Sequence, residues 1–92
     1  MDMKEAVRTA KKHITELFTD ETITHVGLEE VEFNNSSNNW EITIGFSRPW
    51  QNISLATALS NRPPARSYKL VCINDNDGHM ISVTDRVLTD SQ

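Results

Sequence analysis

VGLEEVEFNNSSNNWEITIGF, residues 26–46, is the stretch that decides the fold class. Its second half alternates apolar residues with polar or small ones, which is the pattern of a half-buried β-strand. The apolar positions of this strand are Trp40, Ile42, Ile44 and Phe46. The polar run at residues 34–39 is typical of a turn, so the stretch predicts an antiparallel hairpin.

The first strand of this hairpin needs one extra residue to keep its apolar side chains on the core face. A regular register would place Glu29 opposite Ile44, pointing into the core. A β-bulge at Glu29–Glu30 removes this conflict, because a shift by one residue moves every following side chain to the other face. The pairs predicted in this way are Phe33–Trp40, Val31–Ile42, Leu28–Ile44 and Val26–Phe46.

Before the hairpin, the chain begins with a predicted amphipathic helix that ends near Phe18. Apolar residues recur at steps of three and four and form one stripe. Asp2 can cap the first turn, and Glu5 stands three residues later, at the spacing of a capping box. The stripe consists of Met3, Ala6, Val7, Ala10, Ile14, Leu17 and Phe18.

A second hairpin follows near the end of the chain, where SYKLVCIN and HMISVTDR flank the loop DNDG. Gly78, the last loop residue, suits the left-handed conformation that such a loop needs. The pairs predicted are Asn74–His79, Cys72–Ile81, Leu70–Val83 and Tyr68–Asp85. This register predicts that Leu70, Cys72, Ile81 and Val83 face the helix, and that Val71, Ile73 and Met80 lie on the outer face.

These elements predict a single α+β domain over residues 1–92, in which an N-terminal helix packs on a four-stranded antiparallel meander sheet. The tail, residues 87–92, is expected to fray.

A connection of nineteen residues, RPWQNISLATALSNRPPAR (48–66), joins the two hairpins. Two interpretations are open. The connection could cover the outer sheet face, with SLATALS as a short helix, or it could form a docking surface together with that face. The predicted interaction surface consists of Trp50, Ile53, Leu55, Leu59, Val71, Ile73 and Met80.

The composition excludes several classes of protein. Thirteen acidic against nine basic residues give a net charge of −4, which argues against nucleic acid as the main ligand. No run reaches the roughly 20 apolar residues of a membrane helix, and the charged first dozen residues do not resemble a signal peptide. The single cysteine, Cys72, excludes an internal disulfide. We therefore expect a cytoplasmic protein.

No motif predicts a metal, a cofactor or a catalytic site. Aligning NDNDG with a calcium loop on Gly78 puts Ile73 first and Thr84 twelfth, and neither can serve as a ligand. GFSRP lacks the second glycine of a nucleophile elbow. The histidines have no metal-site spacing, and the acids of the first hairpin are expected to be exposed without a pocket that would raise a pKa. These residues are His13, His25 and His79, and Glu29, Glu30, Glu32 and Glu41. The sequence thus favours a protein that is not an enzyme.

The order KEAVRTAKKHI, VGLEEVEFNNSSNNWEITIGF, SYKLVCINDNDGHMISVTDR resembles PepSY-type domains and their cystatin-like relatives. The matching pieces are Leu28 to Phe33, Trp40 to Phe46, and Asp77, Gly78, Ile81 and Val83, with residues 48–66 as an insertion. Small bacterial immunity-type proteins look similar. The resemblance implies a helix followed by strands, and a non-catalytic role in binding or inhibiting a protease or another protein.

Three functional hypotheses follow. The first is a non-enzymatic, inhibitor-like or regulatory module that binds a protein partner and neither nucleic acid nor membrane. The second is a small-ligand binder or cryptic enzyme with a cavity on the concave sheet face, lined by Trp40, Tyr68 or Trp50. The third is a homodimer that forms through strand edges or the outer face.

Overall fold

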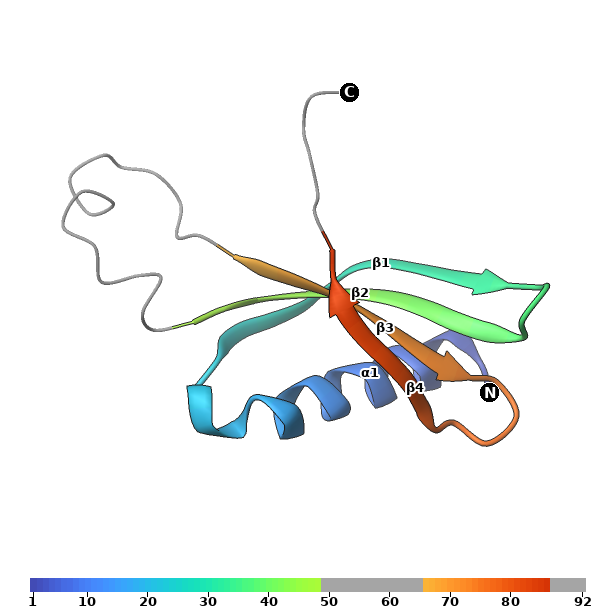
Figure 1. Ribbon diagram of the computed structural model, residues 1–92, viewed down its shortest axis with the longest axis horizontal. Helices are drawn as coiled ribbons and strands as arrows, with labels where there is room; N and C mark the ends of the chain where they lie inside the picture. The colour runs from blue at the N-terminus through green and yellow to red at the C-terminus, as the bar shows by residue number, and fades with distance from the viewer. Residues whose placement is uncertain (49–65, 87–92) are drawn as a thin grey trace, which may run out of the picture.

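One helix and four strands follow one another in the predicted order in the computed structural model, which describes residues 1–48 and 66–86. The helix lies along one face of the sheet, and the other face has no helix over it among the described residues (Figure 1). The elements are α1 (Met3–Leu17), a 3-10 turn (Thr19–Glu21), β1 (Thr24–Asn34), β2 (Asn39–Ser47), β3 (Ser67–Asn74) and β4 (Met80–Asp85).

Helix α1 is capped at both ends by hydrogen bonds made by the residues that flank it, Asp2 and Phe18. The Asp2 carboxylate accepts a hydrogen bond from the Glu5 backbone N–H at 2.8 Å, so the predicted N-cap is confirmed. At the other end, the Phe18 N–H donates to the Ile14 carbonyl at 3.1 Å. The helix buries one narrow stripe, Ala6, Ala10 and Ile14.

The four strands form one antiparallel sheet in the order β1-β2-β3-β4, which is a meander. Both hairpins therefore lie side by side, with β2 and β3 in the centre and β1 and β4 at the two edges. Helix α1 contacts β1, β2 and β3. The predicted α+β fold class, an N-terminal helix on a four-stranded antiparallel meander, is confirmed.

The register of the first hairpin confirms the predicted bulge. The pairing shifts between Leu28 and Glu30, and the pairs Phe33–Trp40, Val31–Ile42 and Leu28–Ile44 are as predicted. A second irregularity, which the sequence pattern did not indicate, lies between Thr24 and Gly27. His25 has a φ of 56° there, and the predicted pair Val26–Phe46 falls within this irregular segment.

The register of the second hairpin was predicted wrongly beyond its turn. The hydrogen bond from Asn74 N–H to the His79 carbonyl (3.0 Å) agrees with the prediction, and Gly78 has the expected positive φ of 73°. An unpredicted bulge then shifts the pairing, because Ile81 has no partner opposite it. The observed pairs are Ile73–Met80, Cys72–Ser82, Val71–Val83, Leu70–Thr84 and Lys69–Asp85, in place of Cys72–Ile81, Leu70–Val83 and Tyr68–Asp85.

The face prediction for this hairpin is therefore corrected. Val71 and Ile73 are fully buried in the core beneath α1, and Met80 packs against it, so these three do not form an outer surface. Ile81, predicted to face the helix, is 46% exposed. The reason is that β3 also pairs with β2, where Val71 lies opposite Ile42. Directly opposed residues share a face, so β2 decides which side of β3 joins the core.

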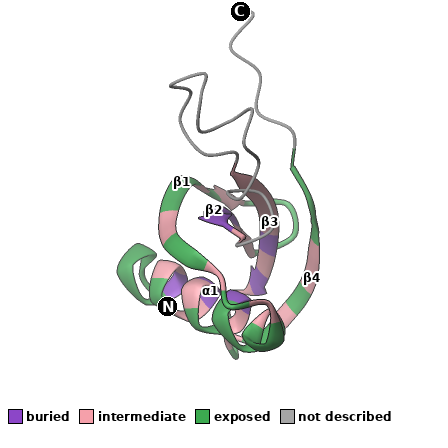
Figure 2. Cartoon of the chain, turned by 90° about the vertical axis from the view of Figure 1, so that its left-hand side faces the viewer, coloured by how far each residue is buried: buried purple, intermediate pink, exposed green. Residues whose placement is uncertain are grey.

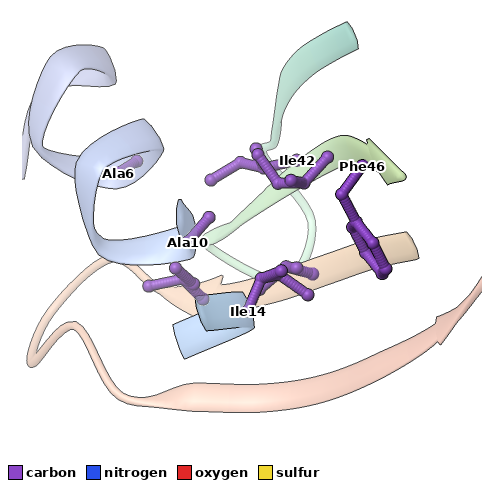
Figure 3. Packing of buried hydrophobic residues seen from close by; sticks show 8 residues of the cluster. Ala6, Ala10, Ile14, Ile42 and Phe46 are labelled. Atoms are coloured by element: carbon purple, nitrogen blue, oxygen red, sulfur yellow. The ribbon is translucent and has the colours of Figure 1, made fainter. Parts of the chain in front are cut away.

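The core fills the space between α1 and the two central strands. Figure 3 shows the alanines and Ile14 of the helix facing Ile42 and Phe46 of the sheet. In Figure 2 the buried stretches lie on the inner side of α1 and on β2 and β3, while much of β1 and the outer side of α1 are exposed. The fully buried apolar residues are Ala6, Ala10, Ile14, Ile42, Ile44, Phe46, Val71 and Ile73.

Candidate functional site

Positively charged side chains gather at one end of the sheet. Arg48 follows β2, Arg66 precedes β3, and Arg86 follows β4, while Lys69 lies near the start of β3. Neighbouring antiparallel strands run in opposite directions, so the end of β2, the start of β3 and the end of β4 meet at the same place. Four of the nine Lys and Arg residues of the chain come together there.

These residues surround a cavity of about 530 Å³. Every described residue that lines it is charged or polar, and one of these residues is acidic. The lining residues are Arg48, Arg66, Ser67, Tyr68, Lys69, Asp85 and Arg86. We refer to it below as the basic cavity. Its wall opposes four cations with one carboxylate in a protein whose overall charge is −4.

Each cation of the basic cavity also has a carboxylate partner. Lys69 pairs with Asp85, the acidic residue of the wall. The other three partners lie outside the lining. The distances are 3.4 Å from Arg48 Nε to Glu21 Oε1, 3.4 Å from Arg66 Nη2 to Glu29 Oε2, and 2.8 Å from Arg86 Nη2 to Glu30 Oε1. These outer carboxylates orient the three guanidinium groups beside the cavity.

Aromatic rings at the margin of the core hold two of the cations. The guanidinium carbon of Arg48 lies 5.1 Å from the centre of the Phe18 ring and 5.4 Å from that of Phe46. The Lys69 ammonium lies 5.7 Å from the Phe18 ring centre. Cations at these distances are attracted to the ring face. The side chains of Arg48 and Lys69 are only 16% and 17% exposed, so their charges have a defined position before any ligand arrives.

Asp85 is the counter-ion inside the basic cavity. A hydrogen bond from Lys69, followed by the charges of Lys69 and Arg48, holds the pKa of the Asp85 carboxyl below its usual value, although desolvation opposes this shift. Asp85 is therefore ionised at neutral pH. Its side chain is 83% exposed, in contrast to that of Lys69, so the carboxylate is the accessible member of the pair.

A glycine on β2 lets charged groups lie directly on the sheet beside the cavity. A Cβ atom at Gly45 would come within 2.8 Å of both Arg66 Nη2 and Glu29 Oε2, and within 3.1 Å of the Tyr68 ring. The Glu29–Arg66 pair thus rests against the β2 backbone. The Glu30 carboxylate, which pairs with Arg86, also accepts a hydrogen bond from Thr43 Oγ1 at 3.4 Å.

The polar DNDG turn lies at the opposite end of the sheet. The side chains of this turn and of Asn74, which precedes it, make hydrogen bonds within the fold. Asn74 Oδ1 accepts hydrogen bonds from the N–H groups of Asn76 (2.8 Å) and Asp77 (3.3 Å). The Asp75 carboxylate accepts from Trp40 Nε1 at 2.9 Å and pairs with the Met1 amino group at 3.2 Å. The Trp40 bond, and then the amino group, lower the pKa of Asp75.

The predicted interaction surface does not coincide with the basic cavity. Three of its residues, Val71, Ile73 and Met80, belong to the core, and the other four lie outside the described residues. Those four are Trp50, Ile53, Leu55 and Leu59, and residues 87–92, predicted to fray, lie outside the described ranges as well. Of the aromatic residues predicted for a ligand cavity, Tyr68 lines the basic cavity, whereas Trp40 is tied to the DNDG turn.

The sequence reasoning missed the four cations of the site. A signal was nevertheless present, because three arginines flank strand ends that a meander brings together. In residues 1–48 and 66–86, no group of three His, Cys, Asp or Glu side chains could hold a metal ion. No helix within these ranges is long and apolar enough to cross a membrane.

Comparisons with protein-family models, curated proteins and solved structures found no match to this chain. The resemblance to PepSY-type and cystatin-like domains therefore stays a prediction, as does the cytoplasmic location.

Proposed function

We propose that this protein is a non-enzymatic binding module that holds a partner protein by a carboxylate-rich segment, in an inhibitor-like or regulatory role. The observation that carries the proposal is the basic cavity, in which Arg48, Arg66, Lys69 and Arg86 converge from three strand ends. Charge-assisted hydrogen bonds from guanidinium groups to carboxylates are among the strongest that side chains make, and two parallel bonds are common.

The placement of the cations supports specific binding. Arg48 and Lys69 are held over aromatic rings, so a ligand would not have to order them, and this lowers the entropic cost of association. The net charge of −4 repels acidic molecules in general. An acidic segment therefore gains only at the lining of the basic cavity, where four cations face one carboxylate, and there it competes with the outer carboxylates for the three guanidinium groups.

The chemistry of the wall favours a protein segment over a drug-like small molecule. Small-molecule pockets are lined mainly by apolar and aromatic side chains, whereas among the lining residues within 1–48 and 66–86 Tyr68 is the only aromatic one. A small polyanion is the second candidate, because a volume of about 530 Å³ would accommodate one. Both candidates use the same cations, so one set of variants tests them together.

The test is a binding titration with fluorescein-labelled hexaglutamate and, separately, with citrate. The variant Lys69→Gln/Arg86→Gln removes two charges from the basic cavity. The matched control, Lys4→Gln/Arg8→Gln, removes two from the exposed side of α1. We expect hexaglutamate to bind the unchanged protein, the cavity variant to lose at least about tenfold in affinity, and the control to change little.

Circular dichroism and thermal unfolding of all three proteins confirm that the variants fold. An equal loss of hexaglutamate affinity in the cavity variant and in the control would show that binding depends only on the total charge of the protein, which would contradict the proposal. Citrate binding as tightly as hexaglutamate would favour the small polyanion instead.

A further inference from the structure

The two edges of the sheet differ in how well they are protected against pairing with another strand. β1 carries three glutamates, Glu29, Glu30 and Glu32, and its ladder is interrupted twice. Charges and bulges at an edge prevent further pairing. In β4, by contrast, residues 80–84 carry no charge, and the ladder is interrupted once, at Ile81, after which the pairing from Ser82 to Asp85 is regular. β4 is therefore the edge that can accept a strand.

The hydrogen bonds of β4 show which of its backbone groups point outward. The Arg86 N–H donates to the Tyr68 carbonyl of β3 at 3.0 Å. The direction of the backbone groups alternates along a strand, so Ser82 and Thr84 also face β3. Val83 and Asp85 then direct their N–H and C=O groups away from β3. Within residues 1–48 and 66–86, no strand pairs with this side of β4.

The outer edge of β4 leads directly to the basic cavity. Asp85 is the last residue of the strand, Arg86 follows it, and both line the cavity. A chain that paired with β4 would pass Val83 and Asp85 and would then reach Arg86. Lys69 lies on β3 opposite Asp85, so a side chain of the added strand would reach it across the end of β4. Its backbone would bind to the edge while its side chains reached the cations. Because those side chains meet a wall of four cations and one carboxylate, the complementary residues are acidic.

We propose that the partner's acidic segment binds as a fifth strand along the outer edge of β4, with its carboxylates in the basic cavity. This inference rests on the proposed function and specifies its binding mode. Backbone hydrogen bonds to an edge strand provide affinity without regard to sequence, and side-chain sites provide specificity. Here the outward N–H and C=O groups of Val83 and Asp85 provide the affinity, and the four cations provide the specificity.

The first experiment measures amide hydrogen exchange by NMR on the whole protein, with and without the probe peptide acetyl-VEVEVE-amide. This peptide alternates β-forming and acidic residues. We expect the Val83 and Asp85 amides to exchange at least about tenfold more slowly in its presence. The Ser82 and Thr84 amides, which already face β3, and the amides of β1 should change little and serve as internal controls.

The second experiment removes one outward donor. Val83→Pro deletes the N–H that faces away from β3, a position where an edge strand tolerates proline. Val83→Ala removes the same packing against the core but keeps the N–H, and is the matched control. We expect Val83→Pro to bind the probe peptide about tenfold more weakly than Val83→Ala does. Equal affinity of the two variants would contradict strand addition.

The outcomes separate this inference from the proposed function. If the peptide binds and Lys69→Gln/Arg86→Gln weakens it, but the Val83 and Asp85 amides are unchanged, the cavity binds acidic segments without strand addition. The proposed function then stands and the fifth strand is wrong. If the peptide does not bind at all, both are wrong. Amide protection that rises with protein concentration, together with dimers in sedimentation, would assign the edge to a second copy and overturn the inference.

Discussion

The two faces of the sheet are buried in different ways. Along β2, Ile42, Ile44 and Phe46 point towards α1, while Thr43 and Ser47 point to the other face, and all five are at most 2% exposed. On the first face apolar groups of the helix cover the strand. On the second face, beside Thr43 and Gly45, the cover includes Glu29, Glu30 and Arg66.

This difference separates stability from binding. Apolar burial contributes about 1.5–3 kcal/mol for each large side chain, and no ligand can replace it. An ion pair near the surface contributes about 0–1 kcal/mol, and a competing carboxylate can take the place of one partner. The apolar cover of the helix face is therefore expected to hold the fold, and the ion pairs of the charged face, Glu29–Arg66 and Glu30–Arg86, are expected to remain exchangeable.

Ile44→Ala is expected to have the largest effect, because Ile44 is fully buried beneath α1. Removing a buried isoleucine leaves a cavity and costs about 2–5 kcal/mol in the free energy of unfolding. The control is Thr43→Val on the same strand, which keeps the volume and removes only a 3.4 Å hydrogen bond to Glu30. Urea denaturation measures both. A smaller loss of unfolding free energy for Ile44→Ala than for Thr43→Val would mean that the charged face, not the helix face, contributes more to stability.

Gly45→Ala tests the charged face directly. The new methyl group would push aside the flexible ends of Glu29 and Arg66 and would require the Tyr68 ring, 3.1 Å away, to give by a few tenths of an ångström, so the expected cost is at the low end of that for overpacking, about 1 kcal/mol. Gly27→Ala is the matched control, since its Cβ would meet only Arg66 Nη2, at an ordinary 3.9 Å. Thermal unfolding should show a lowered midpoint for Gly45→Ala alone. Equal midpoints would mean that Glu29, Arg66 and Tyr68 can move away from residue 45 without a cost in stability.

The pair between Glu30 and Arg86 is expected to contribute little to stability. Both side chains are substantially exposed, at 50% and 41%, so a double-mutant cycle with Glu30→Gln and Arg86→Gln should give a coupling of about 0.2–1 kcal/mol. The coupling should fall as salt is added. A coupling several times larger, or one insensitive to salt, would show that this pair is part of the fold rather than a replaceable cover.

Acidification is expected to remove the contribution of the Asp85 carboxylate to stability, and this is the smallest of the expected effects. Its pKa is lower in the folded protein than the ordinary value of 3.8, so the unfolded chain binds a proton more readily. The stabilisation is therefore complete above about pH 4 and is lost as the pH falls through the folded pKa. Thermal midpoints between pH 7 and pH 2 should fall less for Asp85→Asn than for the unchanged protein. Identical pH profiles would remove Asp85 as the counter-ion of Lys69.

The candidate site was less predictable than the fold. The four cations of the basic cavity are separated along the chain, from Arg48 to Arg86, and none belongs to a spacing motif. Only the strand order of the sheet brings them together. Val71 and Ile73 of the second hairpin, which were predicted to belong to an interaction surface, are fully buried core residues.

By itself the sequence determined the helix, the first hairpin and its bulge at Glu29. In these segments the apolar residues follow one pattern, so a single register brings residues such as Ile14, Ile42 and Ile44 into the core. In β3 both faces carry apolar residues, Leu70 and Cys72 on one side and Val71 and Ile73 on the other. The local pattern therefore does not choose between them. The tertiary structure chose by pairing Val71 with Ile42 of β2 and by placing the bulge at Ile81, because contacts between strands that are distant in the sequence carry energy that no local pattern contains.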